Sequence, residues 1–218
     1  AALKKESITA KDFYRGSSNS LTSIENDLDV RRGIEEGILT EIFLDKEDNS
    51  QKLYSILGHA GSGKTVFLNR LAWEALNKLG KNCYILKKDV LINADAIIEL
   101  FTFTKERIYL IVDNANNNEI EINNLIERSK KDNIPITIIT AERKNIWNVE
   151  CSRVKNHLTH AYFLKYLTTT EIESLIDLLE MHDCLGYLEG KPRETQIKEF
   201  EDRAGRDLLV ALYEATQG

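Results

Sequence analysis

The sequence lacks any run of about 18 consecutive apolar residues, the length that a membrane-spanning helix requires. It also lacks a charged and then apolar leader in front of a small-residue cleavage site. We therefore expect no membrane span and no secretory signal, and we predict a cytoplasmic protein that has no membrane partner.

Cysteine is scarce, and the three cysteines lie far apart at Cys83, Cys151 and Cys184. An odd number without a C-x-x-C pair favours reduced thiols, as in the cytosol, over a disulfide framework. The four histidines show no metal-ligand spacing with cysteines or carboxylates, so the sequence predicts no histidine-based metal site.

An excess of positive charge is also missing, because 29 Lys and Arg face 35 Asp and Glu, for a formal net charge of -6. This balance argues against broad electrostatic binding to nucleic acid or to anionic membranes, and we expect no direct nucleic-acid binding. The chain is 42% hydrophobic, which is enough for a buried core. It opens with Ala1 instead of methionine and stops within an apolar helical pattern, so we expect a part of a longer protein.

Apolar runs and helical patterns alternate through the middle of the chain. The runs predict strands over Leu53–Leu57, Asn82–Leu86, Arg107–Val112, Pro135–Thr140 and His160–Leu164. The helical patterns cover Thr65–Leu79, Ala94–Phe103 and Glu119–Lys131, and an earlier helix is expected from near Val30 to Leu44, with Ile34, Ile38, Leu39 and Ile42 on one stripe. This alternation predicts an α/β fold, in which helices cover both faces of a mostly parallel sheet.

The two ends of the chain follow other patterns. Residues 1 to about 20 look irregular, with a loop cluster at Gly16–Ser20, and residues 45–51 form a polar connection. After Lys165 only helices are expected: one behind the capping box Thr168–Glu171, one near Pro192 and one near Asp207. The expected domains are a lead-in segment at 1–29, a core at 30–165 and a helical domain at 166–218.

One motif dominates the chemistry. The eight residues Gly58, His59, Ala60, Gly61, Ser62, Gly63, Lys64 and Thr65 fit G-x-x-x-x-G-K-[ST] at every fixed position, and Val66 follows in the helix. The glycines let the backbone curl so that its N–H groups point at one anion, and the helix N-terminus favours the same phosphates. Lys64 would reach the β- and γ-phosphates, and the Thr65 hydroxyl would bind Mg²⁺. The motif therefore predicts binding of a nucleoside triphosphate, most simply ATP with Mg²⁺.

A second motif is the apolar run Ile108–Val112, which ends in Asp113. A buried strand of this kind places a carboxylate beside the phosphates to hold Mg²⁺. In vigorous ATPases of the additional-strand type the next residue is commonly a Glu that activates water, but here it is Asn114, which does not take up a proton at neutral pH. We therefore expect slow hydrolysis, with Glu142 as an alternative base.

Thr140 ends the fourth predicted strand, and Arg143 follows it closely. Ligands of open α/β sheets bind beyond the carboxyl ends of the strands, so both side chains are expected near the γ-phosphate. A guanidinium there would detect the third phosphate through charge-assisted hydrogen bonds. The alternative is an ordinary surface arginine that pairs with Glu142 or with solvent.

Together these motifs resemble the STAND class of P-loop NTPases, which are signal-transduction ATPases related to AAA+ proteins. The resemblance rests on Gly58–Thr65, on Val112–Asn114, on Ile138–Arg143 and on the helical tail with Thr168–Glu171 and Asp202–Leu212. It implies a P-loop sheet of the additional-strand type with about five strands, a following helical domain that closes over the nucleotide, and Arg143 as the sensor.

The resemblance is greatest to the NTPase modules of bacterial antiphage defence proteins. It implies self-association on activation, together with effector and sensor domains that lie outside this chain. The chain departs from the pattern at Asn114, at Phe13–Gly16, where the adenine-contacting lead-in has Gly and Arg in swapped order, and at Gly205–Leu208, where a proline-containing motif is expected.

Four functions remain open on the sequence: a slow nucleotide-dependent switch, a remodelling ATPase of the AAA+ kind, a small-molecule kinase, and an interaction module with a vestigial P-loop. Asn114 argues against the remodelling ATPase, the long helical tail against the kinase, and intact Lys64, Thr65 and Asp113 against the vestigial module.

Overall fold

The computed structural model describes residues 9–16, 21–44 and 49–216, and the chain forms two compact units. The sheet unit consists of Ile34–Ala60 and Phe67–Lys165, and the helical unit consists of Ala1–Gly33, Gly61–Val66 and Tyr166–Gly218. Neither unit is one continuous stretch of chain. The predicted domain boundaries, after residue 29 and after residue 165, stay a prediction.

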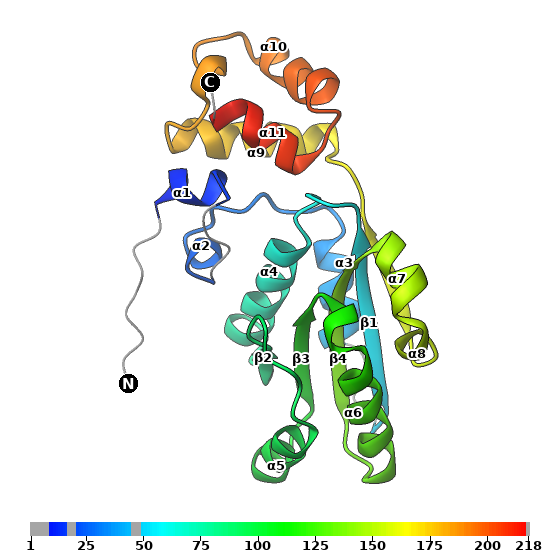
Figure 1. The fold of residues 1–218 in the computed structure, drawn as a ribbon. Helices are drawn as coiled ribbons and strands as arrows, with labels where there is room; N and C mark the ends of the chain where they lie inside the picture. Colours follow the sequence, from blue (N-terminus) through cyan, green and yellow to red (C-terminus); the bar gives the residue numbers. More distant parts are fainter. Residues whose placement is uncertain (1–8, 17–20, 45–48, 217–218) are drawn as a thin grey trace. The chain divides into compact units, whose positions relative to one another are not determined.

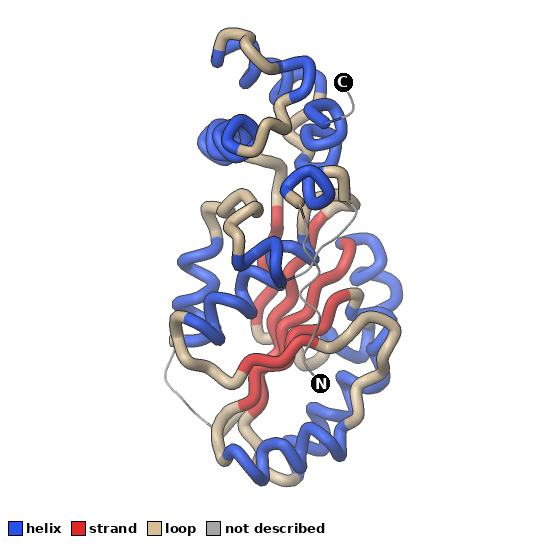
Figure 2. Tube along the Cα trace, turned by 90° about the vertical axis from the view of Figure 1, so that its left-hand side faces the viewer, coloured by secondary structure: helices blue, strands red, loops and turns tan. Residues whose placement is uncertain are grey.

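The sheet unit is built on five parallel strands in the order β2-β3-β4-β1-β5. Figure 1 labels β2, β3, β4 and β1 side by side, and Figure 2 shows the strands of the sheet in red. Their bounds are β1 Gln51–Gly58, β2 Cys83–Ile85, β3 Ile108–Asp113, β4 Ile136–Arg143 and β5 His160–Leu164. Because β4 is inserted between β1 and β3, this is the additional-strand arrangement that the resemblance implies. The predicted α/β fold class is confirmed.

Alternate residues of the strands point to opposite faces of the sheet, and each face packs in its own hydrophobic core. One face, with Tyr54, Ile56 and Ile139, packs on α3 (Glu35–Phe43) and α4 (Lys64–Asn77). The other face carries Leu53, Leu57 and Ile138. It packs on α5 (Ala94–Thr104), α6 (Glu119–Lys131), α7 (Lys144–Glu150) and α8 (Ser152–Lys155). Burial on both faces explains why these strands are apolar runs without polar alternation.

The helix expected from Val30 begins five residues later, at Glu35. Val30 packs in the core of the helical unit, and the Gly33 N–H donates to Glu171 Oε1 at 2.8 Å, so this stretch cannot turn into a helix. Ile34, expected on the apolar stripe, is exposed. Glu35 and Glu36 then occupy the first turn, where carboxylates suit the helix dipole.

The helical unit contains α1 (Ala10–Tyr14), α2 (Leu21–Glu25), α9 (Thr169–Met181), α10 (Arg193–Lys198) and α11 (Leu208–Thr216). The 3₁₀-helix η2 (Gly186–Leu188) lies between α9 and α10, and the π-helix η3 (Glu199–Arg203) follows α10. The expected capping box is present, since Thr168 caps α9 and Glu171 accepts from the Thr168 N–H. The helices expected near Pro192 and Asp207 are present as α10 and α11.

The expectation of an irregular start is wrong for α1, which has its own capping box. The Thr9 hydroxyl accepts from the Asp12 N–H, and the Asp12 side chain accepts from the Thr9 N–H. Phe13 and Tyr14 are buried with Leu175 and Ala211 in the core of the helical unit. Of the predicted Gly16–Ser20 loop, Gly16 has φ 77°, and residues 17–20 lie outside the described residues, as do residues 45–48 of the polar connection.

Among the residues that the structure describes, no helix has the length and apolar character that crossing a membrane requires.

Candidate nucleotide-binding site

The glycine-rich loop leaves the sheet at the carboxyl end of a central strand. Gly58 is the last residue of β1 and pairs with Arg143 of β4 on one side and with Leu164 of β5 on the other. The loop then runs to Lys64, where α4 begins. The motif therefore lies between a strand and a helix, as its chemistry requires.

Two glycines give the loop its curl. Gly61 has φ 80° and Gly63 has φ 85°, backbone conformations that cost other residues about 1 kcal/mol or more. A β-carbon would also collide with the start of α11, because it would lie 2.8 Å from Leu209 Cβ at Gly61 and 2.7 Å from Leu208 Cδ2 at Gly63. The backbone conformation thus requires glycine at both positions. Space requires it at Gly61, whereas the atom near Gly63 is the end of a flexible leucine side chain that can shift.

The remaining loop side chains differ in exposure. Ala60 is exposed, His59, Lys64 and Thr65 are half-buried, and Val66 packs against the core of the helical unit. Ser62 is 1% exposed, and its hydroxyl is buried without a hydrogen-bond partner in the part of the chain that the structure describes.

The end of β3 carries the predicted Mg²⁺ ligand. Asp113 is half-buried and pairs in register with Ala141 of β4. Its Oδ1 accepts from the Asn114 N–H at 3.0 Å. Asn114 itself takes a left-handed conformation with φ 54°, which asparagine tolerates better than most residues, and its side chain is exposed.

Glu142 is tied to the backbone instead of being open to a reacting water. It is 2% exposed. Its Oε2 accepts from the Asn116 N–H at 3.1 Å, and its Oε1 accepts from the Arg143 N–H at 2.8 Å. The carboxylate therefore joins the end of β4 to η1 (Ala115–Asn118), the turn that follows Asp113. This geometry favours a structural role over that of a replacement base.

Thr140 and Arg143 lie in different environments because β4 continues three residues beyond its predicted end. Thr140 is fully buried inside the strand, and its hydroxyl donates to the Tyr54 carbonyl at 3.3 Å, so the expectation that it faces the γ-phosphate is wrong. Arg143 is the last residue of β4 and is exposed. Within residues 9–16, 21–44 and 49–216, no hydrogen bond or ion pair reaches its guanidinium.

The lead-in Phe13–Gly16 does not present its rings to a base. Both Phe13 and Tyr14 are buried in the helical unit, where their ring centroids lie 5.4 Å apart. Arg15 donates to the Thr216 carbonyl of α11 at 3.4 Å.

Comparison with known proteins decides the family. The family model described as Novel STAND NTPase 5 matches residues 11–155, more than half of the chain. The chain belongs to this Novel STAND NTPase 5 family. The resemblance inferred from the motifs is confirmed, and no curated protein matches the sequence.

Solved structures similar to this STAND NTPase are P-loop AAA+ ATPases. The RuvB Holliday junction branch migration motor of Thermotoga maritima has a TM-score of 0.58 at 16% identity, covering 85% of this chain and 61% of that one. The Aeropyrum pernix ORC2 protein in its ADP form has a TM-score of 0.58 at 15% identity, covering 84% and 61%. Drosophila ORC bound to DNA has a TM-score of 0.59 at 14% identity, covering 92% and 63%. At such identities the likeness shows the fold alone, and the chain spans less than two thirds of each structure.

The residues of this STAND NTPase fit a nucleotide and Mg²⁺. The left-handed glycines curl the loop backbone, and the Ser62 hydroxyl, which has no hydrogen-bond partner among the described residues, lies within it. A threonine hydroxyl and one carboxylate are the donors that P-loop proteins offer to Mg²⁺, which keeps several waters of its own. Thr65 carries such a hydroxyl, and Asp113 carries such a carboxylate.

Two buried charged residues near the loop were missed by the sequence analysis as site residues. Arg32 donates to the Ser62 carbonyl, and Glu171, recognised only as a capping residue, pairs with Arg32. A buried ion pair between distant segments leaves no periodic pattern in a sequence, so only the signature of the Glu171 cap was visible.

Proposed function

We propose that this STAND NTPase is a molecular switch that binds ATP with Mg²⁺ and hydrolyses it slowly. The observation that carries the proposal is the complete P-loop at the carboxyl end of β1, in a sheet where β3 and β4 end in Asp113 and Arg143. Ligands of open α/β sheets bind at this edge.

Each site residue has a proposed role. The backbone N–H groups from Gly58 to Val66 surround the phosphates, and the Lys64 ammonium neutralises the β- and γ-phosphates. Thr65 and Asp113 hold Mg²⁺. Bound Mg²⁺ supplies charge neutralisation at the phosphate oxygens.

The slow hydrolysis follows from the side chains beyond β3 and β4. Asn114 occupies the position of the general base, and both carboxylate oxygens of Glu142 accept hydrogen bonds from backbone N–H groups. A positioned general base typically contributes about 10² to 10⁴ in rate, so its loss makes turnover slow.

Arg143 is proposed as the γ-phosphate sensor. It is the N-cap of α7 and pairs with Gly58 at the end of β1, and its side chain is exposed. A ligand shifts a conformational equilibrium only by its different affinity for the two states, and a guanidinium that binds the third phosphate creates such a difference between ATP and ADP.

The location of the protein and its partners are also part of this proposal. We place the protein in the cytoplasm, in agreement with its three free cysteines, and we expect ATP binding to promote self-association. Effector and sensor domains in the rest of a longer chain would then be brought together, as in antiphage defence. A remodelling ATPase with sustained turnover is the rival, and Asn114 argues against it.

Calorimetry with ATP and ADP, each with and without Mg²⁺, tests the site. We expect Lys64→Ala to abolish binding of both nucleotides. Lys78→Ala is the matched control and should bind like the wild type. Lys78 directly follows α4, and its ammonium pairs with Glu74 at 2.8 Å. Unchanged affinity in Lys64→Ala would overturn the site, and sustained phosphate release at tens per second would favour the remodelling ATPase.

A further inference from the structure

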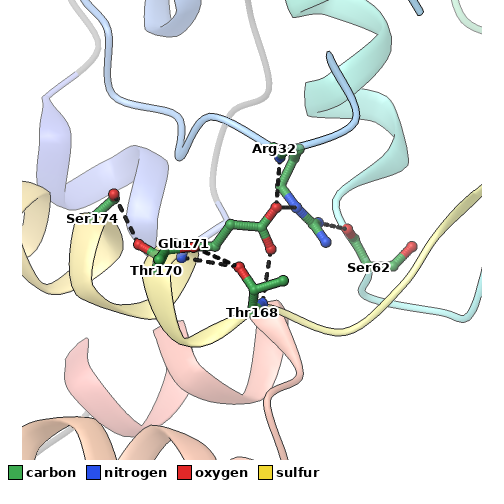
Figure 3. Close-up of polar contacts among 7 residues, drawn as sticks. Arg32, Ser62, Thr168, Thr170, Glu171 and Ser174 are labelled. Carbon is green, nitrogen blue, oxygen red and sulfur yellow. Dashed lines mark hydrogen bonds and ion pairs between the residues drawn. The ribbon is translucent and has the colours of Figure 1, made fainter. Parts of the chain in front are cut away.

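Three segments that are far apart in the sequence meet at one buried arginine in the helical unit (Figure 3). Arg32 Nε lies 3.2 Å from Glu171 Oε1 at the start of α9, and Arg32 Nη1 donates to the Ser62 carbonyl of the glycine-rich loop at 3.2 Å. One guanidinium therefore joins the stretch before α3, the glycine-rich loop and the helical tail.

Glu171 holds this arginine from a fixed position. Its Oε1 also accepts from the Gly33 N–H at 2.8 Å, and its Oε2 accepts from the Thr168 N–H at 2.9 Å. Arg32 and Glu171 are 7% and 8% exposed. Burial alone would raise the pKa of Glu171, but the N–H donors of Thr168 and Gly33 and the Arg32 guanidinium outweigh it and hold that pKa below its usual range. The carboxylate thus stays ionised opposite Arg32.

The contact between Arg32 and the Ser62 carbonyl also fixes the direction of the next backbone N–H in the loop. In a planar trans peptide the C=O and the following N–H point in opposite directions. Because the Ser62 carbonyl points toward Arg32, the Gly63 N–H points away from Arg32. Gly63, with φ 85°, has no side chain to limit rotation of this peptide, so an outside contact is needed to hold it.

We propose that Arg32 is a positioning residue for nucleotide binding: held by Glu171, it locks the Ser62–Gly63 peptide so that the Gly63 N–H is presented to a phosphate. The proposal rests on the nucleotide-binding function proposed above. It deepens that function by making the affinity for phosphates depend on the ion pair between Arg32 and Glu171 of α9.

Affinity for ADP is the first test. A hydrogen bond to a charged group contributes about 1.5 to 3 kcal/mol, so Arg32→Met should raise the Kd for ADP about tenfold to a hundredfold. Arg193→Met is a matched control, because Arg193 also bonds one carboxylate, Asp177 at 2.5 Å, and one carbonyl, that of Glu173 at 2.7 Å, but neither belongs to the loop. The control should bind ADP like the wild type.

Arg32→Lys covers the case in which Arg32→Met fails to fold. A lysine keeps the charge and the stem but lacks the fork that serves a carboxylate and a carbonyl together. It should fold with a melting temperature near that of the wild type and still bind ADP more weakly.

A single resonance reports on the peptide itself. Gly63 is the only one of the 11 glycines that follows a serine, so labelling serine carbonyls with ¹³C and glycine amides with ¹⁵N yields one correlated signal, from Ser62–Gly63. ADP should shift the Gly63 amide proton downfield in the wild type and in Arg193→Met, and by a smaller amount in Arg32→Lys. The Ser62 carbonyl shift should differ between Arg32→Lys and wild type before ADP is added. A purely structural role for Arg32 moves neither shift in a variant that remains folded.

The outcomes separate the two proposals. A wild-type protein that neither binds ADP nor shifts the Gly63 signal overturns the proposed function, and this inference with it. A wild-type protein that binds ADP, with the same affinity and the same shifts in Arg32→Lys, overturns the positioning role alone.

Discussion

Glu142 provides the sharpest test of how the site is built, because a catalytic and a structural role predict opposite results for Glu142→Gln. The glutamine keeps the size of the side chain but replaces one carboxylate oxygen with an NH₂ group. That group would face a backbone N–H, either of Asn116 or of Arg143, in a position that is 2% exposed.

The expected cost follows from these contacts. One charge-assisted hydrogen bond is lost and a buried N–H is left without an acceptor, a loss of about 2 to 3 kcal/mol. For a chain of this size the melting temperature should fall by about 5 to 10 °C. ATP hydrolysis per folded molecule should stay at the wild-type level, because Glu142 carries no proton for the reaction.

The assay pairs thermal unfolding with steady-state phosphate release, measured well below the melting temperature of the variant. Glu150→Gln is the matched control: Glu150 also contacts Asn116, at 3.4 Å from its side-chain amide, but it is exposed, so neither quantity should change. Glu142→Gln with wild-type stability and reduced phosphate release would refute the structural reasoning and identify Glu142 as the base.

Three other outcomes are expected. Asn114→Glu should raise phosphate release about tenfold or more, because it supplies the missing base, and an unchanged rate would show that water activation does not limit turnover. Burial raises the pKa of the Cys83 and Cys151 thiols to about 12, so iodoacetamide at about pH 8 should modify them slowly in the folded protein and rapidly in urea, as followed by mass spectrometry; equal rates would contradict this burial. The pKa of Glu171 is lowered in the folded protein, so its ionised form contributes stability above the unfolded pKa of about 4.3, and this stability is lost as the pH falls through the folded pKa. The difference in melting temperature between wild type and Glu171→Gln should therefore shrink from about pH 6 to about pH 3. A constant difference would contradict the lowered pKa.

The sheet was accessible to sequence reasoning because its strands are buried on both faces. The apolar run up to Val112 and the glycine motif after Leu57 fall where the structure has β3 and the loop. The end of β4 was missed since Glu142 looks like a surface residue, and only the backbone N–H groups that it binds explain its burial. The helices over residues 144–155 were missed because they are short and their buried residues, such as Trp147 and Val154, lie too far apart for a clear period.

The helical unit was harder to predict because its contacts are non-local. Phe13 and Tyr14 look like parts of an irregular lead-in, and their burial depends on α9 and α11. Arg32 and Glu171 are separated by 139 residues, and no local pattern indicates that two charged side chains will pair in a core. The motif located the loop, whereas the groups that orient its backbone required the structure.

The discontinuous helical unit also has a consequence for biosynthesis. Arg15 bonds the carbonyl of Thr216, 201 residues further along, and α1 shares a core with α11. On the ribosome, the sheet is complete in sequence once Leu164 has emerged, whereas the aromatic rings of α1 remain exposed to water until α11 has emerged. Phe13 and Tyr14 are therefore exposed to chaperones until α11 has been made, and the glycine-rich loop acquires its contact with Arg32 and Glu171 only when α9 has been made.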